Sequence, residues 1–303
     1  YKLEKLELNN SQKIYLHFGL NKVYKDLKNY KKSFFYLQSG NKLQREALTY
    51  DINVHKVLSE KIKSTFSKID FKEIGSIDGG ENNIFILGMP RSGTTLIEKI
   101  ISSHSNVSTI SEANFISQKL HGYINKDFKE LKKILNSNFQ KKYIEFIKSF
   151  NTKNAKIIDK TLTNFWYLGF IKIIFPKAKI IHVSRNPKDN CLSIFENLFD
   201  YPEGWNYDQK ELAEYYLIYK DLMEFWNNIF RDSILNVRYE DVILDTEKKI
   251  KELISFCDLN WEDSCLDFHK NNNPIKTVSF NQANKPIYKS SIKKYELYEK
   301  ELE

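Results

Sequence analysis

A short apolar segment that ends in a glycine and leads into a helix constrains the fold of this chain more than any other feature. Ile84-Phe85-Ile86-Leu87 is followed by Gly88, and an apolar helical periodicity begins at Leu96. A continuous apolar run of this length, bounded by glycine, is typical of a strand that is buried on both faces. The sequence therefore predicts a strand, a loop and a helix in direct succession.

The same pattern recurs along the chain. Further apolar runs lie at 155–158, 179–183 and 234–237. Stretches of helical periodicity separate or follow them, at 128–150, 163–175, 188–199, 208–230 and 245–257. Short buried strands that alternate with helices indicate an α/β fold, in which a parallel sheet is flanked by helices in three layers. The tail from 270 to 303 is interpreted as irregular and then helical.

The first 70 residues are predicted to form a helical segment of their own. Residues 11–47 fit two helices with a polar turn at Lys28-Asn29-Tyr30, and 48–68 fit a further helix. The pair resembles one tetratricopeptide repeat, although Asn21 stands where that repeat usually has Gly. An ordinary helical hairpin is the alternative. We interpret the glycine-rich, polar segment 71–83 as a linker to a domain that covers 84–303.

One such repeat cannot bury its apolar face alone. It must pack on further repeats, on the next domain or on another chain. The sequence therefore leaves open whether this segment forms a homodimer.

Composition excludes several classes of protein. The 303 residues carry 47 Lys and Arg against 39 Asp and Glu, a net charge of +8 that suits anionic partners. We find no apolar run long enough to span a membrane, no signal-peptide pattern and no element that reads nucleic acid. Three cysteines without a Cys-x-x-Cys pair argue against a disulfide framework and a zinc site. We therefore expect a cytoplasmic protein without a metal site.

The segment Gly88-x4-Gly93-Thr94-Thr95 has the glycine spacing of a nucleotide P-loop. In such a loop, backbone N–H groups and the N-terminus of the following helix bind an anion. Thr94 stands where the P-loop has Lys, whose charge a kinase or an ATPase needs against a polyphosphate. Arg91 supplies a cation instead, and its planar fork suits phosphate oxygens.

The heptapeptide Pro90-Arg91-Ser92-Gly93-Thr94-Thr95-Leu96 resembles the 5′-phosphosulfate loop of sulfotransferases. The wider segment Ile84–Ser105 is similar to the tetratricopeptide-linked bacterial sulfotransferases, which are related to tyrosylprotein sulfotransferases. The resemblance implies a bacterial protein with the sulfotransferase fold, and the donor 3′-phosphoadenosine 5′-phosphosulfate. It also implies the residues of the loop that bind this donor: Arg91, Ser92, Gly93, Thr94 and Thr95.

Later segments extend the resemblance to roughly residues 80–300. Arg185 and Ser193 have the spacing of the family motif that binds the 3′-phosphate. Asn186 and Asn197 stand where relatives have Asp and a second Arg, so another cation can be needed there. Tyr239, in Arg238-Tyr239-Glu240-Asp241, resembles the tyrosine that lies near the adenine, and a core tyrosine is the alternative.

The C-terminal part contains further candidates for donor binding. Ser279 and Lys285 lie in segments that resemble the family's donor-covering loop, and Lys289 is a rival to Lys285.

The resemblance also implies the catalytic residues. Glu112 lies at the distance from Arg91 at which tyrosylprotein enzymes carry their catalytic Glu, so it is the predicted general base. A helix start at Ser111-Glu112 is the alternative. Lys160 lies 25 residues before Arg185, as does the lysine that assists the bridging oxygen in those enzymes. His104 and His182 are rival bases, which we interpret as structural and core residues.

The sequence thus predicts an enzyme that transfers a sulfuryl group to an acceptor hydroxyl by in-line displacement, with Glu112, Lys160 and Arg91 as catalytic residues. A P-loop-type kinase and a nucleotide-sensing module with a helical repeat are the alternatives. The acceptor stays open among a protein tyrosine, a carbohydrate, a lipid and a small phenol.

Overall fold

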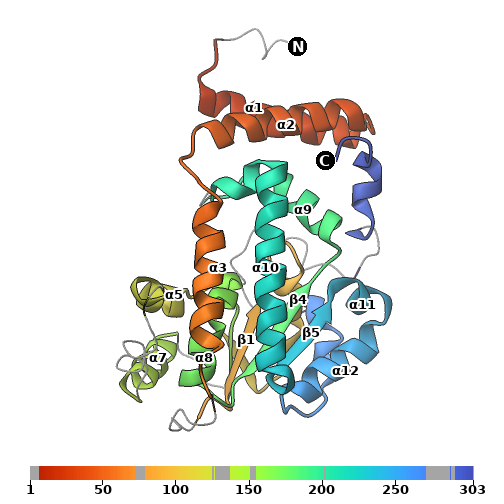
Figure 1. Ribbon diagram of the computed structural model, residues 1–303. Coiled ribbons are helices and arrows are strands. Elements are labelled where there is room, and N and C mark those ends of the chain that lie inside the picture. The colour runs from red at the N-terminus through yellow and green to blue at the C-terminus, as the bar shows by residue number, and fades with distance from the viewer. Residues whose placement is uncertain are drawn as a thin grey trace. The chain divides into compact units, whose positions relative to one another are not determined.

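Figure 1 presents the protein as a computed structural model. The structure describes residues 7–71, 79–124, 126, 137–150, 155–200, 203–270, 287 and 291–302. Contacts divide the chain into two compact units. Unit 1 comprises Tyr1–Lys56, Asn186–Ile218 and Ser290–Glu303, and unit 2 comprises Val57–Arg185 and Tyr219–Lys289. The predicted division into 1–70, 71–83 and 84–303 follows position in the sequence rather than packing, and it stays a prediction.

Unit 2 is built on a parallel sheet. In the part of the chain that the structure describes, five strands pair in the order β2-β3-β1-β4-β5. Their bounds are β1 (Asn83–Leu87), β2 (Val107–Thr109), β3 (Lys156–Asp159), β4 (Lys179–Ser184) and β5 (Ile234–Arg238). The predicted α/β fold with a parallel sheet is confirmed. The sequence did not predict β2, because this three-residue strand carries the polar residues Ser108 and Thr109 and buries only Val107 fully.

The strand order explains where a ligand can bind. The chain leaves β1 for β2 and β3 on one side of the sheet, and it later adds β4 and β5 on the other side. In an open parallel sheet, ligands bind beyond the carboxyl ends of the strands, at the point where the strand order reverses. The loop that follows β1 occupies this point.

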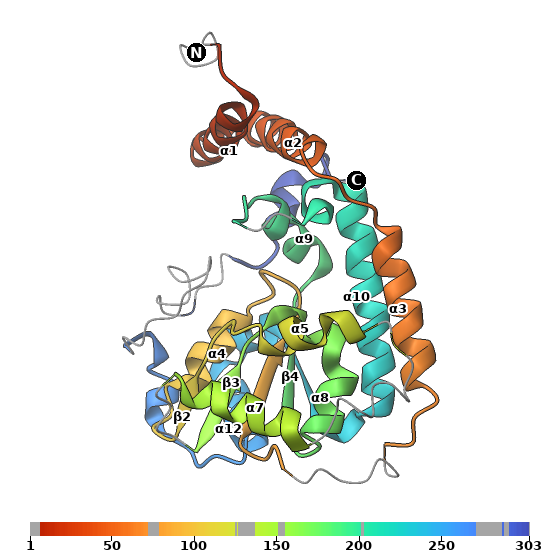
Figure 2. The ribbon, with the colours of Figure 1, turned by 90° about the vertical axis from the view of Figure 1, so that its left-hand side faces the viewer.

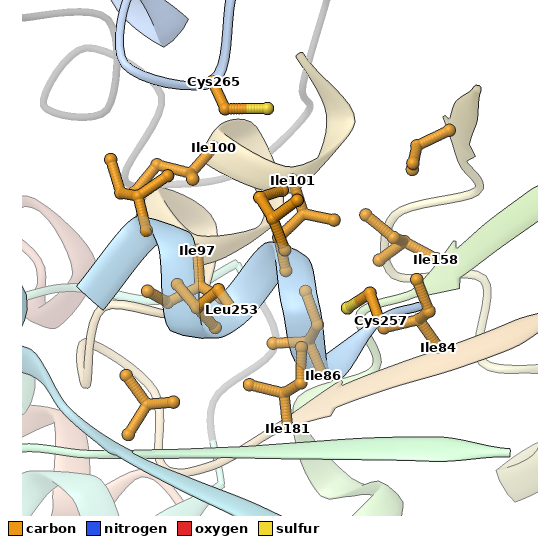
Figure 3. Packing of buried hydrophobic residues seen from close by; sticks show 14 of the residues in the cluster. Ile84, Ile86, Ile97, Ile100, Ile101, Ile158, Ile181, Leu253, Cys257 and Cys265 are labelled. Carbon is orange, nitrogen blue, oxygen red and sulfur yellow. The ribbon is translucent and has the colours of Figure 1, made fainter. Parts of the chain in front are cut away.

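One face of the sheet packs on α4 (Thr94–Ser102) and α12 (Thr246–Phe256). Successive side chains of a strand point to opposite faces. Accordingly, Ile84 and Ile86 of β1 and Ile181 of β4 lie in one buried cluster with residues of these two helices (Figure 3). The cluster fixes α4 against the sheet and so fixes the position of its first turn.

The opposite face is covered by aromatic side chains. Phe85 packs on Tyr143 of α7 (Ser137–Lys148) and on Phe175, which follows α8 (Leu168–Ile174), with ring centroids 6.1 and 6.0 Å apart. Gly169 of α8 allows a close approach, since a Cβ there would lie 2.4 Å from the Phe66 ring. Figure 2 shows α4 and α8 on opposite sides of β1 and β4.

Unit 1 contains the predicted helix pair, α1 (Asn10–Asp26) and α2 (Tyr30–Glu46). Asn21 is buried between them, and its Oδ1 accepts a hydrogen bond of 2.7 Å from the Ser33 hydroxyl. Gly40 lets the helices approach, since a Cβ there would lie 3.1 Å from the His17 Cβ. Asn21 stands where the repeat usually has Gly, and its side chain is accommodated by the hydrogen bond from Ser33. The assignment to a tetratricopeptide repeat stays a prediction.

The other elements complete the two units. The remaining helices are α3 (Asn53–Phe66), α5 (Phe115–Leu120), α9 (Pro187–Phe195), α10 (Gln209–Ile229) and α11 (Tyr239–Leu244). Short 3₁₀ helices lie at His121–Tyr123, Leu162–Tyr167, Gly204–Tyr207, Arg231–Ser233, Asp263–Cys265, Phe268–Lys270 and Lys294–Tyr298. Among the described helices, none combines the length and the apolar character that a membrane crossing needs.

Candidate active site

Side chains of predicted function follow the carboxyl ends of the strands of unit 2. The loop Gly88–Thr95 follows β1, and the other strands are followed by Glu112 (β2), Lys160 (β3), Arg185 (β4) and Tyr239 (β5). Because the strands are parallel, these residues belong to one edge of the sheet. The order β2-β3-β1-β4-β5 places Glu112 and Lys160 on one side of the loop and Arg185 and Tyr239 on the other.

The loop after β1 has a backbone that its glycines make possible. Gly93 has φ +107°, and a Cβ at this position would lie 2.5 Å from the Tyr239 ring. A Cβ at Gly88 would lie 2.4 Å from the Val183 carbonyl oxygen. Arg91 also has a positive φ of 63°, which costs free energy in a residue with a side chain and is concentrated at functional sites. The loop is thus pressed against β4 and Tyr239.

The loop and the first turn of α4 form a cradle for an anion. Thr94 and Thr95 are buried at the N-terminus of this nine-residue helix, which carries the positive end of the helix dipole. The Ser92 hydroxyl is fully buried and has no hydrogen-bond partner among the described residues. A buried hydroxyl is ordinarily hydrogen-bonded, so its position fits a ligand that supplies the partner.

We call Arg91, Arg185 and Tyr239 the nucleotide side, after the donor contacts that the sequence predicts for them. The Arg185 Nη1 donates a hydrogen bond of 3.1 Å to the Arg91 carbonyl oxygen. The guanidinium of Arg185 also lies over the Tyr239 ring, 5.0 Å from its centroid, as a cation–π contact. Tyr239 is only partly buried, so the alternative of a core tyrosine does not describe it. Segments far apart in the sequence therefore meet at the loop.

Glu98, Glu112 and Lys160 form the acid–base side. The Lys160 side chain is fully buried, and its Nζ donates a hydrogen bond of 2.5 Å to Glu112 Oε1. The same Nζ lies 3.5 Å from Oε2 of Glu98, which is also fully buried. Glu112 is 39% exposed, so a substrate can reach the carboxylate that Lys160 holds. The structure brings the predicted base and the predicted lysine into direct contact.

The segment that carries Glu112 is held by backbone bonds rather than by a helix. The Lys160 N–H donates a hydrogen bond of 2.9 Å to the Ser111 carbonyl oxygen, and the Asn114 N–H donates one of 3.2 Å to Thr161 Oγ1. Ser111 and Asn114 both have positive φ values, of 53° and 55°. The helix α5 begins only at Phe115, and the Ser111 hydroxyl donates to Glu98 instead of capping it. The alternative of a helix start at Ser111-Glu112 is therefore wrong.

Asp159 anchors the backbone beside Lys160, the partner of Glu112. It is buried at the end of β3 and accepts hydrogen bonds from the Thr161 hydroxyl at 2.7 Å and the Tyr143 hydroxyl at 3.0 Å. Burial raises the pKa of Asp159 above its ordinary value, and the hydrogen bonds from Thr161 and Tyr143 oppose this rise. The backbone on both sides of Lys160 is thus anchored.

The rival histidines have their ring nitrogens engaged elsewhere. The Asn106 N–H donates a hydrogen bond of 3.0 Å to His104 Nδ1, and His104 Nε2 lies 2.8 Å from the Asn260 carbonyl oxygen. His182 contacts Asn236 and Tyr219 at 2.7 and 2.5 Å, and burial lowers its pKa. Both rings therefore serve as structural groups, and neither takes the place of the predicted base.

The other predicted donor contacts fall in unit 1 or outside the described residues. Ser193 belongs to α9 in unit 1, where the Asn197 side chain donates 2.6 Å to its carbonyl oxygen. The clamp of Arg185 and Ser193 stays a prediction. Ser279, Lys285 and the rival Lys289 lie outside the described residues. In the described ranges, no cluster of three or more His, Cys, Asp or Glu side chains is placed to hold a metal ion.

Sequence reasoning did not identify Glu98 or Asp159. A signal for Glu98 was available: it is a carboxylate within the apolar helical run of Leu96, Ile97 and Ile100, and it stands one turn after Thr94. Asp159 stands directly before Lys160, but its contact with Tyr143 joins residues that no local pattern connects.

Comparison with known proteins identifies the family of this chain. The chain matches the model of the sulfotransferase family over residues 83–263. It is 33% identical over 303 residues to an uncharacterized protein of Aquifex aeolicus, covering 94% of this chain and 40% of that protein. It is 24% identical over 241 residues to a protein-tyrosine sulfotransferase of Drosophila melanogaster, covering 70% of this chain and 46% of that protein. The chain thus spans less than half the length of either relative.

A solved structure shares the fold. The sulfotransferase domain of the Synechococcus PCC 7002 olefin synthase is 20% identical, with a TM-score of 0.51 and coverage of 73% of this chain and 90% of that domain. The family match covers more than half of the chain and includes the loop, Glu112, Lys160, Arg185 and Tyr239. The chain belongs to the sulfotransferase family.

Proposed function

We propose that this chain transfers a sulfuryl group from 3′-phosphoadenosine 5′-phosphosulfate to the hydroxyl of an acceptor. The observation that carries the proposal is the arrangement at the carboxyl edge of the sheet. An anion-binding loop has the contact between Glu112 and Lys160 on one side. On its other side it has the contact between Arg185 and Tyr239.

The loop fits a phosphosulfate better than a polyphosphate with its metal ion. Thr94 occupies the place of the P-loop lysine and is buried at the start of α4. The buried Ser92 hydroxyl, the N-terminus of α4 and Arg91 offer hydrogen-bond donors to an anion of modest charge. We assign the phosphosulfate to these groups. Arg185 is assigned to the 3′-phosphate and Tyr239 to the adenine, with Ser193, Ser279 and Lys285 as further predicted contacts.

The residues of the acid–base side account for the chemistry. The bound donor supplies the sulfur atom: the acceptor oxygen forms a bond to it while the bond from sulfur to the bridging phosphate oxygen breaks. The partly exposed Glu112 takes the proton of the acceptor hydroxyl. Lys160 directs its positive charge toward the oxygen that leaves, and Arg91 supports the phosphate from the loop. Asp159 keeps the Lys160 backbone in place.

We propose tyrosine hydroxyls of acidic peptides as the first acceptors to test. A curated relative carries the name protein-tyrosine sulfotransferase. The net charge of +8 suits a negatively charged peptide.

Calorimetric titration tests the donor assignment. The chain should bind 3′,5′-adenosine bisphosphate more tightly than ADP or 5′-AMP, and Arg91→Ala and Arg185→Ala should weaken this binding. Transfer is then followed with ³⁵S-labelled donor and tyrosine peptides, phenols or water as acceptors. Equal affinity for ADP, together with Mg²⁺-dependent ATP turnover, would contradict the proposal and support the P-loop-type kinase.

A further inference from the structure

Glu98 is a buried charge that the proposed mechanism does not use. It lies in α4, one turn beyond the loop, and its side chain is fully buried. Its Oε1 accepts hydrogen bonds from the hydroxyls of Thr109, at 2.6 Å, and Ser111, at 2.8 Å. Its Oε2 lies 3.5 Å from the Nζ of Lys160.

Packing of α4 does not explain this carboxylate. The helix is held to the sheet by Ile97, Ile100 and Ile101, which lie in the buried apolar cluster (Figure 3). A buried ion pair is often no more stabilising than an apolar side chain of similar volume. The stability of the fold therefore does not account for Glu98.

The contacts of Glu98 join the parts of the acid–base side. One oxygen binds hydroxyls of β2 and of the segment that leads to Glu112, and the other faces the lysine that holds Glu112. We propose that Glu98 is the positioning residue of the site, which holds the Lys160 ammonium and the Glu112 segment in register during transfer. This inference rests on the proposed function.

The charges give this role a physical meaning. Before transfer, the Lys160 ammonium donates a hydrogen bond to Glu112 and lies 3.5 Å from a carboxylate oxygen of Glu98. When Glu112 takes the acceptor proton, its negative charge is lost. Glu98 then remains as a carboxylate beside the buried ammonium, so that Lys160 stays compensated and in place.

A set of variants tests the proposal. Glu98→Gln keeps the shape of the side chain and removes its charge, and Lys160→Met removes the ammonium. Donor consumption by Glu98→Gln should fall by about 10- to 100-fold, the loss seen when an orienting partner is removed from a reactive site. The affinity for 3′,5′-adenosine bisphosphate should stay within about threefold, because the nucleotide side is untouched. Glu98→Gln should add little to the loss in a Lys160→Met background, because it acts through Lys160.

A milder pair of variants guards against loss of folding. Ser111→Ala removes one hydroxyl donor to Glu98 and should lower donor consumption by about threefold. Ser102→Ala removes a buried hydroxyl of the same helix that donates to the Lys99 carbonyl oxygen, and it should leave consumption unchanged. Equal effects of the pair would contradict the proposal.

An acceptor-independent readout separates this inference from the proposed function. Acetic anhydride labelling of Lys160, read by mass spectrometry, should be slow in the wild type, since the side chain is fully buried. It should rise at least about tenfold in Glu98→Gln when the ammonium loses its position. A wild type that consumes no donor would overturn the proposed function, while labelling would still decide whether Glu98 holds Lys160. Unchanged labelling and unchanged consumption in Glu98→Gln would overturn the inference.

Discussion

The nucleotide side and the acid–base side flank the same loop but are built differently. Arg91, Arg185 and Tyr239 are partly exposed, and they contact one another through a backbone carbonyl and a ring face. On the acid–base side, Glu98 and Lys160 are fully buried and only Glu112 reaches solvent. The acid–base side is thus assembled by contacts within the chain, and we propose that the donor completes the nucleotide side.

The largest effect that would sharpen this comparison is expected for Lys160→Met. Transfer should fall by about a thousandfold, since both the partner of Glu112 and the charge near the leaving oxygen are lost. Affinity for 3′,5′-adenosine bisphosphate should fall much less, by about tenfold, because one charge near its 5′-phosphate is lost while the nucleotide side is intact. Parallel assays of donor consumption and calorimetric titration check this result. A matching loss of affinity would break the distinction between the two sides.

A large effect of the opposite kind is expected for Arg91→Ala. Loss of its charge-assisted hydrogen bonds should weaken binding of 3′,5′-adenosine bisphosphate by about 100-fold. The melting temperature should change little, because this side chain is partly exposed. Titration and thermal melting measure the two quantities. Arg91→Lys serves as the control that keeps the charge without the planar fork. Its affinity for the bisphosphate should lie between those of the wild type and Arg91→Ala.

An intermediate effect is expected for Gly93→Ala. A Cβ would meet the Tyr239 ring at 2.5 Å and force alanine to a φ of +107°, so the free energy of unfolding should fall by about 1–3 kcal/mol. Nucleotide affinity should fall with it, since Tyr239 must move. Gly122→Ala is the matched control, because a Cβ there meets nothing within 4 Å. Denaturant unfolding of both variants checks the prediction, and equal losses would argue against a strained loop.

The smallest effect concerns pH and a residue that belongs to neither side. Burial lowers the pKa of His182 below its ordinary value of 6.5. The unfolded chain therefore binds a proton below pH 6.5 that the folded chain does not bind. The free energy of unfolding should fall with decreasing pH by about 1 kcal/mol per pH unit from this residue. His182→Gln should remove this part of the slope, and an unchanged difference between pH 7 and pH 5.5 would contradict the assignment of a buried neutral ring.

Local patterns predicted the fold well. The apolar runs gave β1, β3, β4 and β5, because a strand buried on both faces reads as a continuous apolar segment. The strand β2 was missed, since it is short and polar. The helix α11 was missed because a segment as short as Tyr239–Leu244 shows no helical periodicity of its own.

The acid–base side could not be assembled from the sequence alone. Lys160 and Glu112 are separated by 48 positions, and their pairing depends on β2 lying beside β3. Glu98 was missed for the same reason, because its partners lie on β2 and beyond β3. Family resemblance indicated Glu112 and Lys160, but only the strand order explains why these residues meet.

The most direct test of the different roles of the two sides compares Glu112→Gln with Arg185→Ala. Each variant is titrated with 3′,5′-adenosine bisphosphate and with ADP, and each is assayed for consumption of ³⁵S-labelled donor at saturation. We expect Glu112→Gln to bind the bisphosphate as the wild type does and to lose transfer, and Arg185→Ala to lose the preference over ADP. Weakened binding in Glu112→Gln, with the preference intact in Arg185→Ala, would contradict the account.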